Sequence, residues 1–137
     1  MTRDETTEHA IEMIDFNLDK GYLGAAVVVA SNYVQLRLGS LLADHYLPKK
    51  HGKKWVGMAT LFRETYPHVL LERCQEFEII DQTESNILKQ LFNIRNNAAH
   101  KTDLWHKPKV KEKGLRTQAT QLCNQAKDFL EQTSQTD

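Results

Sequence analysis

Apolar residues recur at every third or fourth position along most of this chain, and that spacing predicts helices. The predicted helical segments lie around residues 10–18, 23–47, 55–62, 70–77, 81–100 and 115–130. The second segment is the longest, and its apolar stripe consists of Val27, Ala30, Val34, Leu38 and Leu41. Its opening AAVVVA run favours a strand locally. Because the stripe continues for four more turns, the pattern as a whole predicts a helix.

Local signals mark where several of these helices begin and end. Gly21 closes the first helix, and Pro67 stops the third because proline lacks a backbone N–H. Asp81 and Glu84 have the spacing of a capping box, in which each side chain binds the other residue's backbone N–H. We therefore expect a helix to begin at this pair.

The fold class follows from what the pattern contains and what it lacks. We find no alternation typical of strands, no internal repeat and no low-complexity tract. The sequence predicts an all-α protein, a small bundle of four to six helices with one long second helix. We expect a single helical domain over residues 1–132 and a disordered tail over residues 133–137.

Charge and apolar runs bear on where the protein works. Eighteen basic residues balance eighteen acidic ones, so no global field draws the chain to nucleic acid or anionic lipid. The most apolar run, residues 23–30, is too short to cross a bilayer. Cys74 and Cys123 lie on apolar stripes without metal-site or redox spacing, which predicts buried thiols in a reducing compartment. We expect a cytoplasmic protein without membrane contact.

The candidate chemistry lies in RNNAAH, Arg95–His100, at the end of the fifth predicted helix. An arginine can neutralise a phosphate and a neutral histidine can accept a proton near pH 7. The spacing alone carries no weight, because about 0.8 such Arg/His pairs are expected by chance in a chain of this composition. A second pair exists at Arg63 and His68, but Pro67 falls between those two residues.

A helical wheel gives the first pair a setting that the second lacks. Ile94 lies on a core stripe, and a second apolar strip lies about 120–160° away. That second strip consists of Leu88, Phe92 and Ala99. A helix that is apolar on two sides packs against two partners. The simplest second partner is another copy of the same helix, so we expect a homodimer with Arg95, Asn96 and His100 at the edges of its seam.

The sequence IRNNAAHK resembles the Arg-Asn-x-x-Ala-His signature of the higher eukaryotes and prokaryotes nucleotide-binding (HEPN) domains. The resemblance implies a small all-α bundle, with the motif at a helix C-terminus and two copies facing one cleft. Catalytic members are metal-independent endoribonucleases, often toxins or antiviral effectors. Lys101 stands where many members have glycine, and Thr102 stands where one toxin branch has tyrosine.

The resemblance assigns roles to three residues as a catalytic set. His100 would remove the proton from an RNA 2′-hydroxyl, and Arg95 would stabilise charge on the phosphate. Asn96 would hold the histidine or a phosphate oxygen. The alternative is a purely structural helix end, where His100 interacts favourably with the negative end of the helix dipole and Arg95 pairs with a surface carboxylate.

Further residues could take part in binding the RNA. Three lysines of the polar loop after the motif are expected to contact the RNA backbone: Lys101, Lys107 and Lys109. Three polar residues of the long second helix are candidates to line the cleft, although such positions are more often ordinary: Tyr33, Gln35 and Arg37.

The function that we expect is therefore RNA cleavage by a homodimer within a toxin or defence system, with an antitoxin or regulatory protein as a possible partner. The scattered histidines lack metal-site spacing and no phosphate-binding glycine loop occurs, so we expect neither metal nor cofactor. The rival expectation is a non-catalytic helical interaction or regulatory module, resembling the HEPN-like mannitol repressors.

Overall fold

The computed structural model describes residues 4–47, 52–100 and 113–134, and within them it contains α-helices and no strand. The helices are α1 (Glu5–Asp19), α2 (Leu23–Tyr46), α3 (Lys53–Arg63), α4 (Pro67–Glu76), α5 (Gln82–His100) and α7 (Lys113–Gln132). The predicted all-α bundle is confirmed, including the long second helix.

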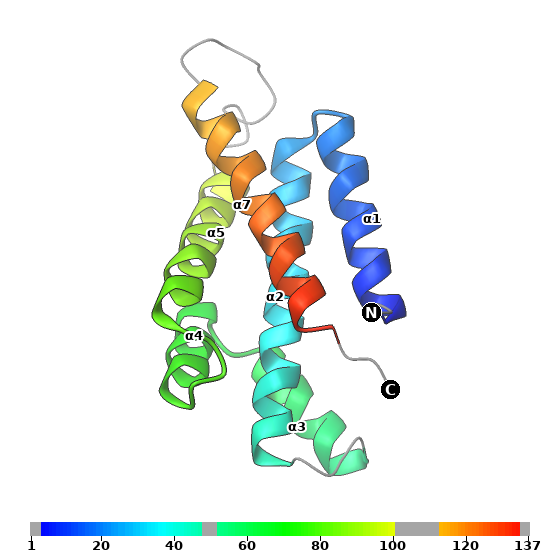
Figure 1. Cartoon of the computed structure of the whole chain (residues 1–137), viewed down its shortest axis with the longest axis vertical. Helices are drawn as coiled ribbons and strands as arrows, with labels where there is room; N and C mark the ends of the chain where they lie inside the picture. Colours follow the sequence, from blue (N-terminus) through cyan, green and yellow to red (C-terminus); the bar gives the residue numbers. More distant parts are fainter. Residues whose placement is uncertain (1–3, 48–51, 101–112, 135–137) are drawn as a thin grey trace.

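Helix α2 is the centre of the bundle, because every other described helix packs against it. Figure 1 shows α1 and α7 beside one half of α2 and α3 beside its other end. Val27, Val34 and Leu38 on its stripe are fully buried, which explains why packing overrides the strand preference of the valine run. By length and composition alone α2 could also span a membrane, but half of its apolar window is buried in the bundle, and core helices give the same signal.

Two of the three predicted boundary signals act as expected, and Pro67 differs: α3 already ends at Arg63, and Pro67 begins α4 instead of stopping α3. Gly21 forms the turn after α1 with a φ of 77°, a conformation that suits glycine. Pro67 is the first residue of α4, where its missing N–H costs nothing. The Glu84 N–H donates to Asp81 Oδ1 at 2.7 Å and the Asp81 N–H donates to Glu84 Oε1 at 3.0 Å, so the capping box is confirmed.

Helix α5 corrects one expectation about its second apolar strip. Leu91 and Ile94 are buried on the core stripe as predicted, but Leu88 and Phe92 of the second strip are equally buried within the single chain. The reason is that α5 packs against α2, α4 and α7 at once. The side chain of Ala99 lies outside the described residues. The inference that this strip needs a second copy is therefore wrong for Leu88 and Phe92, and the homodimer loses that support.

The two cysteines are free and buried, as predicted. Burial raises the pKa of both the Cys74 and the Cys123 thiols to about 12, so neither is a reactive thiolate near neutral pH.

The start of the predicted tail takes part in hydrogen bonding. The Thr133 hydroxyl donates to the Phe129 carbonyl at 2.7 Å, and the Asp4 N–H donates to Ser134 Oγ at 3.0 Å. Residues 135–137 of that tail lie outside the described residues.

Helices α2 and α3 approach closely at Gly39. A Cβ at that position would lie 3.3 Å from the backbone nitrogen of Arg63 and 3.4 Å from the carbonyl oxygen of Ala59. Contacts this short leave little room for any side chain, so glycine allows the backbone of α3 to rest directly on α2. This contact fixes where α3 ends relative to the middle of α2.

Candidate functional site

The predicted motif occupies the last turns of α5. Arg95 is half-buried there and Asn96 is exposed. The helix extends to His100, but the side chain of His100 lies outside the described residues, as do Lys101, Lys107 and Lys109. The structure therefore describes the arginine and the asparagine of the predicted catalytic set, and the approach of the histidine to them stays a prediction.

The Arg95 guanidinium has two neighbours in the described part of the chain. Its Cζ lies 5.5 Å from the centroid of the Phe92 ring, within the range of a cation–π contact. Its Nη1 donates to Gln35 Oε1 at 3.4 Å, longer than the usual distance of about 2.9 Å for such a bond. No carboxylate among the described residues forms an ion pair with Arg95. The alternative in which Arg95 pairs with a surface carboxylate therefore finds no such partner among the described residues.

Gln35 connects this arginine to a third region of the chain. Its Nε2 donates to the carbonyl oxygens of Arg63 at 2.5 Å and Thr65 at 3.2 Å, where α3 gives way to α4. One side chain of α2 thus contacts the end of α3, the connection to α4 and the motif arginine of α5. Of the three cleft candidates on the long helix, Gln35 is the one that contacts Arg95.

The other Arg/His pair differs, as the sequence predicted. Arg63 ends α3 and His68 lies in the first turn of α4, with the proline at the helix start between them. Both side chains are exposed, and the ring of His68 stacks on Tyr66 with centroids 6.0 Å apart. No contact between Arg63 and His68 joins them into a site.

A second arginine, Arg37, lies in a very different environment. Its side chain is 6% exposed. Its Nη1 donates to the Leu130 carbonyl at 2.8 Å and to Thr133 Oγ1 at 2.9 Å, and its Nη2 donates to Thr7 Oγ1 at 2.6 Å. An Asp4 carboxylate oxygen lies 3.9 Å from Nη2. We call these five residues the Arg37 cluster.

Burial and charge act in opposite directions on Arg37. Burial lowers its pKa from the ordinary value, and the nearby Asp4 carboxylate partly opposes that change. The acceptors come from both ends of the described chain, so the cluster ties α1 and α7 to the middle of α2. Sequence reasoning named Arg37 only as a cleft candidate. Its position three residues after Val34, on the buried stripe, was the signal that could have identified a buried charge.

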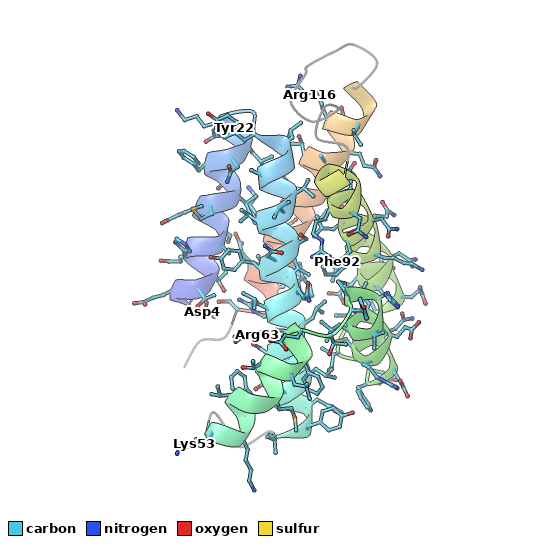
Figure 2. All side chains as sticks on the ribbon, turned by 180° about the vertical axis from the view of Figure 1, so that it is seen from behind. Asp4, Tyr22, Lys53, Arg63, Phe92 and Arg116 are labelled. Carbon is cyan, nitrogen blue, oxygen red and sulfur yellow. The ribbon has the colours of Figure 1, made fainter. Side chains whose placement is uncertain are left out.

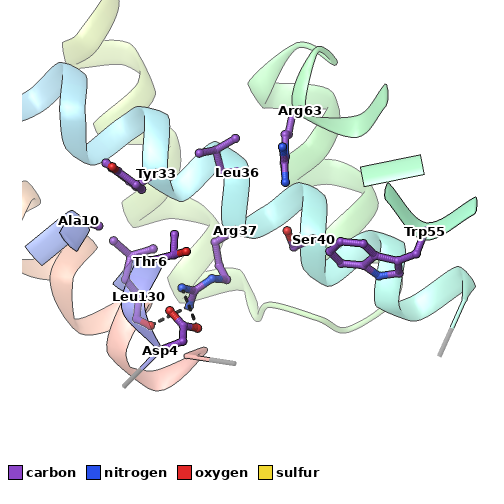
Figure 3. Close-up of a pocket in the computed structure, with 10 residues that line it drawn as sticks. All are labelled: Asp4, Thr6, Ala10, Tyr33, Leu36, Arg37, Ser40, Trp55, Arg63 and Leu130. Carbon is purple, nitrogen blue, oxygen red and sulfur yellow. Dashed lines mark hydrogen bonds and ion pairs between the residues drawn. The ribbon is translucent and has the colours of Figure 1, made fainter. Parts of the chain in front are cut away.

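A cavity of about 280 Å³ lies beside the Arg37 cluster. Figure 3 shows Tyr33, Leu36 and Arg37 of α2 on one side of it and Arg63 and Trp55 of α3 on the other. In Figure 2, Asp4 at the end of α1 and Arg63 at the end of α3 lie at nearly the same height along α2. The cavity therefore lies on α2 between the part that packs against α1 and α7 and the part that packs against α3.

Across residues 4–47, 52–100 and 113–134, no three histidine, cysteine or acidic side chains gather as metal ligands.

Comparison of the chain with protein-family models, curated proteins and solved structures finds no match.

Proposed function

We propose that this chain is a cytoplasmic, metal-independent endoribonuclease of the HEPN type, acting as a homodimer in a toxin or defence system. The observation that carries the proposal is the Arg-Asn-x-x-Ala-His sequence at the end of α5 in an all-helical bundle. The environment of Arg95 supports it. Arg95 is half-buried and held by uncharged neighbours, Gln35 and Phe92, so its positive charge stays available for a phosphate.

The chemistry that we propose uses the RNA's own 2′-oxygen as nucleophile. His100 takes the proton of the 2′-hydroxyl, and the oxygen attacks the adjacent phosphorus. The bond to the 5′-oxygen of the next nucleotide breaks, and that oxygen takes a proton from solvent water and leaves as a 5′-hydroxyl. Arg95 stabilises the charge that builds on the phosphoryl oxygens, and Asn96 orients the histidine or a phosphate oxygen. Lys101, Lys107 and Lys109 bind the flanking backbone.

Incubation of the pure protein with RNA in EDTA tests this proposal. We expect cleavage with 2′,3′-cyclic phosphate and 5′-hydroxyl ends, and no cleavage of DNA or of RNA carrying 2′-O-methyl at the scissile nucleotide. Arg95→Ala and His100→Ala should each reduce the rate by at least about a hundredfold. A requirement for magnesium, or equal cleavage of DNA, would exclude this mechanism.

Matched controls exist for both variants. Arg73 is an exposed arginine whose only described ion pair is to Glu76 on the same helix, and His68 is an exposed histidine at the start of α4. Arg73→Ala and His68→Ala should leave the cleavage rate unchanged, because the described contacts of these side chains, to Glu76 and to Tyr66, do not include the motif. Equal losses in the motif and control variants would show that the motif has no special role.

The dimer is a separate part of the proposal and has its own measurement. Light scattering at high micromolar concentration should give twice the mass of one chain. An active protein that is monomeric under those conditions would mean that one copy of the motif suffices.

The rival proposal is a non-catalytic interaction or regulatory module, resembling the HEPN-like mannitol repressors. One observation favours it: Arg95 contacts Gln35 and Phe92 of its own chain, and an arginine held in this way can serve structure alone. A folded protein that cleaves none of a varied set of RNAs would favour this module over the nuclease.

A further inference from the structure

The carboxamide of Gln35 lies where α2, α5 and the α3–α4 connection meet. Its oxygen accepts from Arg95, and its nitrogen donates to the Arg63 and Thr65 carbonyls. The contacts to these partners span 60, 28 and 30 residues of sequence. Gln35 is half-buried, and each of its three distant partners can only donate or only accept a hydrogen bond. These contacts distinguish it from a solvent-exposed polar residue on a helix surface.

The two carbonyl groups determine which way the amide points. Both N–H groups of Gln35 are used by oxygen acceptors, so its single oxygen must face Arg95. The reversed amide would place N–H groups against a guanidinium, which has only donors, and an oxygen against two carbonyl oxygens. The orientation therefore follows from the chemistry of the neighbours.

Gly39 explains why the carbonyl groups are within reach. It lies one helical turn after Gln35 on α2, and the backbone nitrogen of Arg63 lies 3.3 Å from where a Cβ of Gly39 would be. The end of α3 is thus held against α2 by backbone contact. The Arg63 carbonyl belongs to the last residue of α3, and a helix end leaves such carbonyls without an intrahelical donor. Gln35 supplies that donor.

We propose that Gln35 is a positioning residue for Arg95, acting as a neutral acceptor that orients the guanidinium without cancelling its charge. The effect of Gln35 on the rate of RNA cleavage rests on the function proposed above. A carboxylate in this place would form a short, charge-assisted pair and compete with the phosphate. The amide contact, at 3.4 Å, is uncharged and uses only one of the five N–H donors of the guanidinium, so Arg95 can keep it while other donors bind a phosphate oxygen.

The first experiment measures the placement of Arg95 without any activity. The Nε–Hε signal of Arg95 in a ¹H–¹⁵N spectrum is assigned by its loss in Arg95→Lys. Gln35→Met, which keeps the length of the side chain and removes its polar atoms, should shift that signal. Asn32→Ala should leave it unchanged, because Asn32 is an exposed amide on the same helix without a described contact to Arg95. An unchanged signal in a folded Gln35→Met protein would overturn the proposal.

The second experiment measures catalysis by the whole chain. Gln35→Met should lower kcat by about 10- to 100-fold with KM nearly unchanged, because a misoriented Arg95 fails chiefly in the transition state. Gln35→Glu should not restore the rate, because its carboxylate would capture the guanidinium and cannot donate to the two carbonyls at neutral pH. A rise in KM alone, or full activity of Gln35→Glu, would refute positioning by a neutral acceptor.

The two experiments separate the two proposals. A wild-type protein that cleaves no RNA would refute the nuclease, while the Arg95 signal would still decide whether Gln35 orients Arg95.

Discussion

Arg37 of α2 and Arg95 of α5 both lie on helices that pack in the core of the bundle, yet the surroundings of their guanidinium groups differ. Arg37 is 6% exposed and donates three hydrogen bonds of 2.9 Å or less, with a carboxylate at 3.9 Å. Arg95 is half-buried, with one described bond of 3.4 Å and an aromatic ring beside it. A guanidinium with several short hydrogen bonds holds helices together, whereas one with a single long bond among the described residues keeps donors for a ligand.

The comparison also explains why the two sites tolerate different degrees of burial. A charge removed from water must recover its hydration from protein acceptors, and the Arg37 cluster supplies them from α1 and α7. Arg95 stays in partial contact with water and needs fewer acceptors. The N–H donors of Arg95 that make no bond among the described residues can bind water, so they are compatible with a stable fold.

Replacing each arginine by methionine is the strongest test of this contrast. Arg37→Met should lower the free energy of unfolding by about 3–5 kcal/mol, because it leaves buried acceptors and Asp4 without their partner. Arg95→Met should lower it by less than about 1 kcal/mol, since only a long bond and a ring contact are lost. Urea unfolding followed by circular dichroism measures both.

The same pair of variants can also show that the two arginines do not differ in their contribution to stability. Similar losses of stability from Arg37→Met and Arg95→Met would mean that Arg95 is as structural as Arg37. The rival, non-catalytic function would then gain support.

The N-terminal caps of α1 and α5 give a smaller, matched test, because only the cap of α1 lies near one of the two arginines. Asp4 caps α1 by accepting from the Thr7 N–H at 2.6 Å and also lies near Arg37, whereas Asp81 caps only α5. Asp4→Ala should cost about 2 kcal/mol, and Asp81→Ala about 1 kcal/mol, in thermal or urea unfolding.

The control for this test is a carboxylate at the opposite end of a helix. Asp19 ends α1, where negative charge opposes the helix dipole, so Asp19→Ala should be neutral or slightly stabilising. Equal costs for Asp4→Ala and Asp81→Ala would show that the contact between Asp4 and Arg37 adds nothing.

Much of the fold could be predicted from the sequence because its signals are local. The stripe of α2, the proline at the start of α4 and the capping box at Asp81 each act within a few residues. The covering partner of an apolar strip is not a local property. Leu88 and Phe92 indicated a second partner correctly, but the wheel could not show that the partner lies within the same chain.

The residues of the candidate site also divide into those with a local sequence signal and those whose role depends on distant partners. Arg95 and Asn96 were found because the motif is contiguous, and the structure describes both at the end of α5. Gln35 and Arg37 acquire their roles from partners 60 and 93 residues away, and no spacing rule along the chain can indicate such pairs. They differ only by two positions on α2, which turns one toward α5 and the other toward α1 and α7.

The Arg37 cluster has a consequence for the order of events in folding. Its contacts join segments 30 to 96 residues apart, and the bond between Asp4 and Ser134 spans 130 residues. Closing such long loops costs chain entropy, so these contacts should form after the helices have docked. The cluster would then be absent from the transition state, and Arg37→Met would speed unfolding while leaving the folding rate nearly unchanged. Slower folding of Arg37→Met in stopped-flow kinetics would contradict this order. If the folding rate is unchanged, Arg37 controls the unfolding rate and therefore the lifetime of the native state.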